Sequence, residues 1–159
     1  MRIAIGSNHA GFDLKQQIKD YLSKLGRRYK DFGTYSTEPC DNYAYIAAEV
    51  GRSVASGIYD RGILICGTGI GMSIAANKVP GVRAALCNEI FSAKKSREHN
   101  NANILVMGSR IVAVELVKEI VKIWLTTKFM EGRHALRISK YAEVEEGHIR
   151  WRHGVDREN

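Results

Sequence analysis

The sequence of 159 residues contains no run of about 18 apolar residues, which is the length that a membrane-spanning helix requires. Its amino end, residues 1–6, has the pattern of a strand and a turn and lacks the parts of a signal peptide. We therefore expect a cytoplasmic protein that has no membrane partner. No internal repeat, low-complexity block or linker interrupts the chain, so a single domain is expected.

Cysteine is scarce, with one residue at each of positions 40, 66 and 87. An odd number of cysteines excludes a fully paired disulfide framework. The absence of any Cys-x-x-Cys spacing gives no support to a zinc site. We expect all three thiols to be reduced.

Acidic residues are fewer than basic ones, 17 against 24, and the formal net charge is +7. A basic excess of this kind can indicate nucleic-acid binding or a site for small anions. The positive charge is scattered, and it is densest in the carboxyl third without any recognition-helix or RNA-binding pattern. A solvated basic face together with a phosphate pocket explains the charge better than a nucleic-acid partner does.

The chain alternates short apolar runs with segments of helical periodicity, which predicts repeated β-α-β units. Strands are expected at 1–6, 28–32, 62–66, 82–87 and 104–107. Helices are expected at 14–25, 45–55, 73–78, 90–98 and 114–124, with a final helix after Gly132. Right-handed crossovers between these strands give an α/β fold in three layers, with a five-stranded parallel sheet between two layers of helices.

The most informative segment is 61–78, where a cysteine and three alternating glycines separate an apolar strand from an Ala-rich helix. Cys66 is expected at the carboxyl end of that strand, the edge at which open α/β sheets bind ligands. The following loop, 67–71, offers backbone N–H groups that suit a phosphate or an oxyanion. A helix N-terminus beside the sulfur favours the thiolate form, so Cys66 is a candidate base or nucleophile.

Two other interpretations of this segment remain open. The dinucleotide fingerprint Gly-x-Gly-x-x-Gly fails by one position, because Met72 stands where the third glycine belongs. Glu89, about 20 residues further on, could still serve as the ribose-binding acid of a nucleotide site. Cys66 could also be a small buried residue without any chemical role.

Polar residues near other strand ends add to the candidate site. His9 follows the first strand, so the topology predicts that it lies at the same sheet edge as Cys66. His99 stands near the carboxyl end of a helix, where it could also act as a C-terminal cap. Arg133 and Arg137 are spaced i, i+4, and on a helix both point the same way and can hold a phosphate.

Five segments, in order and with matching spacing, closely resemble type B ribose-5-phosphate isomerases, a family that also includes galactose- and allose-6-phosphate isomerases. The segments are 6–12 (GSNHAGF), 31–36 (DFGTYS), 62–78 (GILICGTGIGMSIAANK), 96–100 (SREHN) and 131–137 (EGRHALR). The resemblance covers roughly residues 1–145. It implies a Rossmann-like aldose–ketose isomerase that works without metal, nucleotide or other cofactor. It also implies a homodimer or homotetramer with the active site at the subunit interface.

The resemblance implies specific roles within the site. Cys66 corresponds to the base that moves a proton between C1 and C2, and His99 to the acid that opens the sugar ring. Thr68 corresponds to a catalytic residue that orients the substrate. The implied substrate-binding residues are Asn8, His9, Tyr43, Gly67, Gly69, Ile70, Gly71, Asn100, Arg110, Arg133 and Arg137.

The chain departs from the family pattern at the sugar end of the expected pocket. Asn8 stands where the family usually has an aspartate, and an amide can neither carry charge nor take a proton. The segment that usually reads Asp-Tyr-Pro-x-Tyr is Asp-Asn-Tyr-Ala-Tyr at 41–45, which lacks the proline. We assign the substrate-facing ring to Tyr43, with Tyr45 as the alternative.

Three functions are therefore compared. The leading hypothesis is interconversion of D-ribose 5-phosphate and D-ribulose 5-phosphate through an enediol. The departures at Asn8 and 41–45 leave isomerisation of a hexose 6-phosphate (allose or galactose) as an alternative, and a non-catalytic sugar-phosphate or nucleotide sensor is the third. We expect the isomerase domain to span 1–145 and the tail, 146–159, to pack on a neighbouring subunit.

Overall fold

The computed structural model describes residues 1–39 and 41–147, and these form a five-stranded parallel sheet in the order β2-β1-β3-β5-β4. The strands are β1 (Arg2–Ser7), β2 (Arg28–Asp31), β3 (Arg61–Cys66), β4 (Ala84–Leu86) and β5 (Ile104–Gly108). The helices are α1 (Phe12–Lys24), α2 (Tyr43–Ala55), α3 (Ile70–Ala76), α4 (Ile90–Glu98), α5 (Val114–Thr126), α6 (Arg133–Ile138) and α7 (Lys140–Glu145). The predicted three-layer α/β fold and parallel sheet are confirmed.

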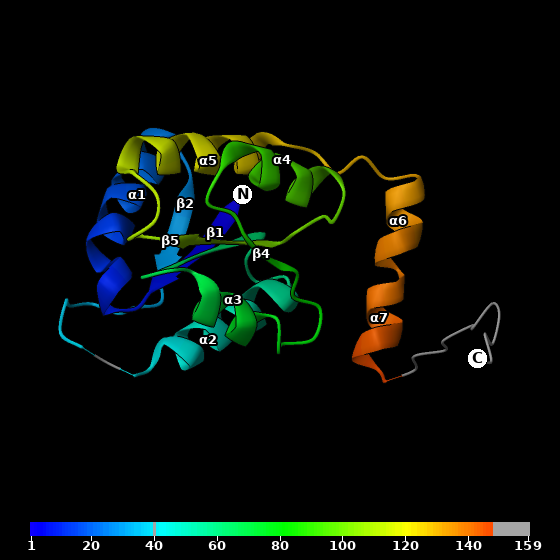
Figure 1. The fold of residues 1–159 in the computed structure, drawn as a ribbon, viewed down its shortest axis with the longest axis horizontal. Helices are drawn as coiled ribbons and strands as arrows, with labels where there is room; N and C mark the ends of the chain where they lie inside the picture. The colour runs from blue at the N-terminus through cyan, green and yellow to red at the C-terminus, as the bar shows by residue number, and fades with distance from the viewer. Residues whose placement is uncertain (40, 148–159) are drawn as a thin grey trace, which may run out of the picture.

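Strand side chains alternate between the two faces of the sheet and so build two cores. Ile63 and Ile65 of β3 pack with α1, α4 and α5 on one face. Leu64 and Cys66 of the same strand pack with α2 and α3 on the other face. Figure 1 shows α4 and α5 above the sheet, α2 and α3 below it, and α1 at its left. The alternation therefore places Cys66 on the face that α3 covers.

Several element boundaries differ from the expected ones. α3 begins at Ile70 rather than at residue 73, because Gly69 adopts a left-handed conformation (φ 83°) and the chain enters the helix directly after it. α2 begins at Tyr43 rather than at residue 45. β4 is shorter than the strand expected at 82–87, since Val82 still belongs to the turn and donates its N–H to the Val79 carbonyl.

The final helix is divided in two at Ser139, and both parts lie apart from the sheet layers, at the right of Figure 1. The predicted helical conformation of Arg133 and Arg137 is confirmed, since both belong to α6. Residues 148–159, most of the predicted tail, lie outside the described residues. Within residues 1–39 and 41–147, none of the helices has the length and apolar character needed to span a bilayer.

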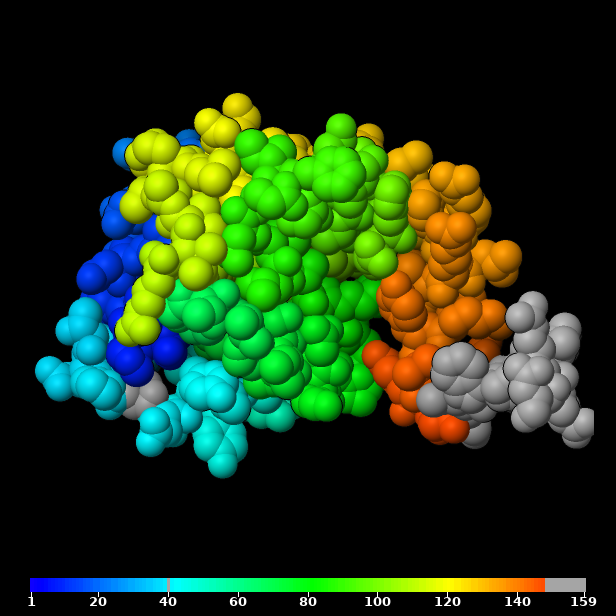
Figure 2. Space-filling model, viewed as in Figure 1, coloured from blue at the N-terminus to red at the C-terminus, as the bar shows by residue number. Residues whose placement is uncertain are grey.

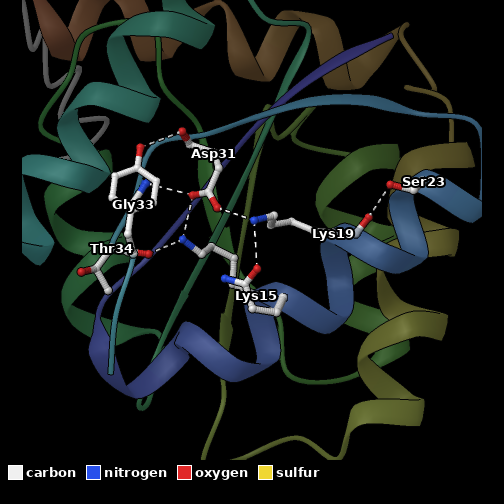
Figure 3. Close-up of polar contacts among 8 residues, drawn as sticks. Lys15, Lys19, Ser23, Asp31, Gly33 and Thr34 are labelled. Carbon is white, nitrogen blue, oxygen red and sulfur yellow. Dashed lines mark hydrogen bonds and ion pairs between the residues drawn. The ribbon is translucent and has the colours of Figure 1, made fainter. Parts of the chain in front are cut away.

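Lys15 of α1 is fully buried beside the end of β2 (Figure 3). Its Nζ donates to Asp31 Oδ1 at 2.7 Å and to the Thr34 carbonyl. Lys19 donates to Asp31 Oδ2 at 2.8 Å, and the Gly33 N–H donates to Asp31 Oδ1 at 2.9 Å. Burial alone would raise the pKa of the Asp31 carboxyl, but these hydrogen bonds together lower it. For Lys15, burial lowers the pKa of the ammonium group. The hydrogen bond to Asp31 raises it again, but only in part.

This network anchors the loop after β2 to the end of β1. The Thr34 N–H donates to the Ser7 carbonyl at 2.6 Å, and the Ser7 N–H donates to the Gly33 carbonyl at 2.7 Å. Because Asn8 and His9 follow Ser7 directly, Lys15 supports the backbone that carries two predicted site residues.

We expect Lys15→Met to lower the free energy of unfolding by about 1–3 kcal/mol, because Asp31 and the Thr34 carbonyl each lose a donor away from water. Lys19→Met is the matched control. Lys19 bonds the same carboxylate but is 21% exposed, so its loss should cost under about 1 kcal/mol. Urea unfolding of both variants measures the difference, and a Lys15→Met protein as stable as the parent would contradict this account of the network.

Candidate active site

Cys66 ends β3 and is buried, with its sulfur under the glycine loop. The Gly69 N–H donates a hydrogen bond to Cys66 Sγ at 3.1 Å. Thr68 lies within the same turn, and its Oγ1 accepts a hydrogen bond from the Ile70 N–H at 3.3 Å. The predicted strand, loop and helix are confirmed as structure, and the thiol lies at the carboxyl edge of the sheet.

The glycine loop lies directly on the end of β5, and no side chain fits between them. A Cβ at Gly108 would lie 2.8 Å from the Thr68 carbonyl group. A Cβ at Gly69 would collide with the Leu86 side chain and lie 3.1 Å from the Met107 carbonyl carbon. Backbone hydrogen bonds from Ser109 to Cys66 (2.8 Å) and from Arg110 to Gly67 (3.0 Å) complete the contact. The loop is therefore held by close backbone packing.

Asn8 and His9 follow β1 at the same edge. The Asn8 N–H donates to the Ile65 carbonyl at 3.2 Å, and Asn8 Oδ1 accepts from the Gly11 N–H at 3.1 Å, which caps the short 3₁₀ helix His9–Gly11. An aspartate could cap this turn equally well through one oxygen. Asn8 therefore differs from the aspartate of the family pattern only at its second polar atom, Nδ2, which donates hydrogen bonds where a carboxylate oxygen would accept them.

Tyr43 and Arg110 flank the loop. A Cβ at Gly71 would lie 2.9 Å from the Tyr43 ring, so this ring packs directly on the loop backbone. Tyr45 is 73% exposed. The Arg110 side chain runs past Gly67, 3.5 Å from the position that a Cβ would occupy there. Of the two tyrosines considered, the structure therefore places Tyr43 against the loop.

His99 and Asn100 lie near the amino ends of the strands, whereas Cys66 lies at the carboxyl ends. They follow α4, which returns the chain to the start of β5. The residues that follow Asn100 form hydrogen bonds with the first residues of neighbouring strands. One of these is the 2.9 Å hydrogen bond from the Gly62 N–H to the Asn103 carbonyl. The length of β5 alone, from Ile104 to Gly108, separates the two edges by about 13 Å.

His99 and Asn100 instead face α6 and α7. The His99 ring stacks on the ring of His134, with centroids 4.2 Å apart and an interplanar angle of 5°. Asn100 Nδ2 donates to the Tyr141 hydroxyl at 3.0 Å. The pKa of His134 is lowered. Burial is the largest cause, and the positive charges of His99, Arg133, Arg137 and Lys95 add to it.

The structure thus separates the predicted site residues into two groups within one chain. The carboxyl-edge group is Asn8, His9, Tyr43, Cys66, Gly67, Thr68, Gly69, Ile70, Gly71 and Arg110. The α6-side group is His99, Asn100, Arg133 and Arg137. Sequence reasoning assigned no role to His134 or Tyr141, since neither has a spacing pattern that indicates its partner. Among the described residues, no cluster of three or more His, Cys, Asp or Glu side chains could hold a metal ion.

Known proteins match this chain over nearly its whole length. The family model described as Ribose/Galactose Isomerase matches residues 3–141. Ribose-5-phosphate isomerase B of Escherichia coli is 47% identical over 145 residues, which are 91% of this chain and 97% of the relative. D-erythrulose-4-phosphate isomerase of Pectobacterium atrosepticum is 41% identical over 150 residues, which cover 93% of this chain and 99% of the relative.

The structural comparison agrees with these matches. The solved structure of Clostridium thermocellum ribose-5-phosphate isomerase B superposes with a TM-score of 0.91 at 50% identity, covering 94% of this chain and 100% of that chain. A solved Mycoplasma genitalium ribose-5-phosphate isomerase B with bound ribulose-5-phosphate gives a TM-score of 0.87 at 39% identity, over 91% of this chain and 96% of that chain. Because sequence and fold agree along almost the entire chain, it belongs to the ribose/galactose isomerase family and is an isomerase.

Proposed function

We propose that this protein interconverts D-ribose 5-phosphate and D-ribulose 5-phosphate through an enediol intermediate. The observation that carries the proposal is the position of Cys66, whose sulfur lies under a loop of backbone N–H donors at the ligand-binding edge of the sheet. The relatives from Escherichia coli and Clostridium thermocellum that bear the name ribose-5-phosphate isomerase B favour the pentose. The cytoplasmic location stays a prediction.

In the proposed mechanism the first step is opening of the furanose ring. His99 donates a proton to the ring oxygen, and the C1–O bond of the ring breaks. The C1 hydroxyl gives its proton to water, from which His99 is protonated again, and the open aldehyde results. Meanwhile His9, Arg110, Arg133 and Arg137 hold the phosphate, for which guanidinium groups supply bidentate donors. Opening exposes C2 to the thiolate.

The second step moves one proton. The Cys66 thiolate removes the proton from C2, and the electron pair moves through C1 to the carbonyl oxygen, which gives an enediolate. N–H groups of the loop at 67–71 are proposed to hold its oxygens, and such donors are worth most where water is excluded. Protonation of C1 by the Cys66 thiol, whose proton exchanges with solvent, and transfer of the hydroxyl proton from O2 to O1 give the ketose. The redox change stays within the sugar, so the proposed reaction needs no cofactor.

A complete site in this proposal needs two copies of the chain. An acid and a base that act on the same sugar must each lie within hydrogen-bond reach of it, yet Cys66 and His99 lie at opposite sheet edges. In a two-fold dimer the same surface is used by both copies, so each carboxyl-edge group meets the α6-side group of the partner. A tetramer would consist of two such dimers.

Exposed apolar surfaces support this arrangement. Ile70 and Ile74, one turn apart on α3 beside the glycine loop, are both more than half exposed. A groove of roughly 540 Å³ lies between α7 and the body of the domain, and Tyr141 and Val144 line it together with Ala84 and Ala85. Figure 2 shows the groove as an opening beside α7. We propose that the partner's α3 packs into this groove.

Gly69→Ala tests the role of the glycine loop. An L-residue in this left-handed conformation costs about 1–2 kcal/mol, and its Cβ would also displace the loop from β5. We expect kcat to fall by about 100-fold, because a small displacement of the reacting groups removes the productive geometry. Gly57→Ala is the matched control, since Gly57 has φ 76° but no atom within 4 Å of the added Cβ. Equal kcat values for the two variants would contradict the role of the loop.

A hexose 6-phosphate is the second candidate substrate, because Asn8 and the segment 41–45 alter the sugar end of the pocket. The relative from Pectobacterium atrosepticum, named a D-erythrulose-4-phosphate isomerase, adds tetrose phosphates to the comparison. The experiment is an assay of kcat/KM on D-ribose 5-phosphate, D-allose 6-phosphate, D-galactose 6-phosphate and D-erythrose 4-phosphate. We expect the pentose to be preferred. A higher value for a hexose or the tetrose would overturn the assignment of substrate.

A further inference from the structure

His134 is held tightly at the junction of α4 and α6. Its side chain is only 4% exposed, and its Nε2 is buried without a hydrogen-bond partner among the described residues. Its backbone N–H donates to the Glu131 carbonyl at 3.0 Å. The Met130 N–H donates to the Glu98 carbonyl, also at 3.0 Å, so the residues before His134 are tied to the end of α4.

The contact that this arrangement provides is a parallel stack on His99. The ring planes differ by 5° and the centroids are 4.2 Å apart, so the two imidazoles overlap face to face. Within the part of the chain that the structure describes, Nε2 makes no hydrogen bond, and the contact observed for the ring is its face against His99. His99 caps α4 through its backbone N–H, which donates to the Lys95 carbonyl at 2.9 Å. The backbone of His99 is thus held by α4, and its side chain is held by the stack on His134.

The charges around the stack favour a neutral His134. Those that act on His134 come from His99 and Lys95 on the α4 side and from Arg133 and Arg137 on its own helix, and all are positive. With burial, they hold the pKa of His134 below its ordinary value, so this ring stays neutral. A neutral His134 ring adds no positive charge beside the His99 ring.

We propose that His134 is a positioning residue that orients the His99 imidazole for ring opening. The inference rests on the proposed function, in which His99 is the ring-opening acid. Because Arg133 and Arg137 lie on the same helix as His134, the stack also links the acid to two proposed phosphate ligands. A substrate whose phosphate seats against α6 then meets an acid that is already oriented.

Two reactions distinguish a His134 that orients the acid from a His134 that only supports the structure. Conversion of D-ribose 5-phosphate requires ring opening. D-ribulose 5-phosphate cannot close a furanose ring, because its C5 oxygen carries the phosphate, so exchange of its C1 hydrogen with D2O requires only the base. Both are followed at saturating substrate by NMR for wild type, His99→Asn, His134→Ala and His134→Phe, after circular dichroism has confirmed that each variant is folded.

We expect His134→Ala to lower kcat for the aldose about tenfold or more, as misorientation of a catalytic group does, while C1 exchange changes less than about threefold. His99→Asn should show the same difference to a larger extent. His134→Phe should restore most of the aldose turnover, because phenylalanine keeps a flat ring in the stack.

Three results would overturn the inference while leaving the proposed function intact. They are unchanged aldose turnover in His134→Ala, an equal loss in both reactions, and a His134→Phe variant as impaired as His134→Ala. A wild-type protein that converts neither sugar refutes the proposed function itself, and the inference falls with it.

Discussion

Cys66→Ala should lower kcat for D-ribose 5-phosphate by about 1000-fold, within the range by which a positioned general base accelerates proton transfer. The thiol is the group that lies under the glycine loop at the carboxyl edge, and alanine cannot accept the C2 proton. Removal of the small sulfur atom from a buried position should leave the fold intact. Steady-state kinetics and thermal unfolding of the same preparation measure both expectations.

Cys87→Ala is the matched control for loss of a buried thiol. Cys87 follows β4, and burial, the largest influence on it, raises the pKa of its thiol. Because it packs in the core between α1, α4 and α5, on the face opposite Cys66, its removal should leave kcat within about threefold of the parent value. Near-normal turnover by Cys66→Ala would show that another group is the base.

Two inactive variants should restore activity when they assemble together. In a dimer of one Cys66→Ala chain and one His99→Asn chain, one site loses both groups and the other site keeps both. Chains with different affinity tags, co-expressed and purified through both tags, should therefore recover about half of the wild-type activity per dimer. The activity is expected to be large against the low background of either variant alone.

The control for this experiment pairs two changes at the same sheet edge. Cys66→Ala combined with Arg110→Ala leaves each site with one altered carboxyl-edge group, so the recovered activity should not exceed that of Arg110→Ala alone. If the Cys66→Ala and His99→Asn pair recovers nothing while the mixed dimer is present, the site is not shared between copies. If the purified protein is monomeric and active, the proposed arrangement is wrong as a whole.

The sequence predicted the sheet and one half of the site because both follow from local patterns. The apolar residues Ile63 to Ile65 predicted a buried strand, and Cys66 was correctly predicted at its carboxyl end. The parallel topology then placed His9 at the same edge, which is confirmed. The start of α3 was predicted too late, because a glycine-rich composition does not reveal which glycine adopts the left-handed conformation.

The other half of the site depended on contacts between distant segments. Sequence spacing located His99 near the end of a helix, but not the side chain that packs against it. A helix between two parallel strands ends at their amino edge, so the topology alone could have separated His99 from Cys66. Lys15 shows the same limit, since one polar residue in an amphipathic helix gives no sign that it is buried against a carboxylate.

Proton NMR of D-ribose 5-phosphate in D2O with the purified protein tests the central claim most directly. The account predicts that D-ribulose 5-phosphate appears with solvent deuterium at C1, since the enediol takes its new proton from a base that exchanges with solvent. No ketose from this substrate would contradict the proposed function, and binding without turnover would favour a sensor. A ketose entirely free of deuterium would contradict proton exchange with solvent at the enediol stage.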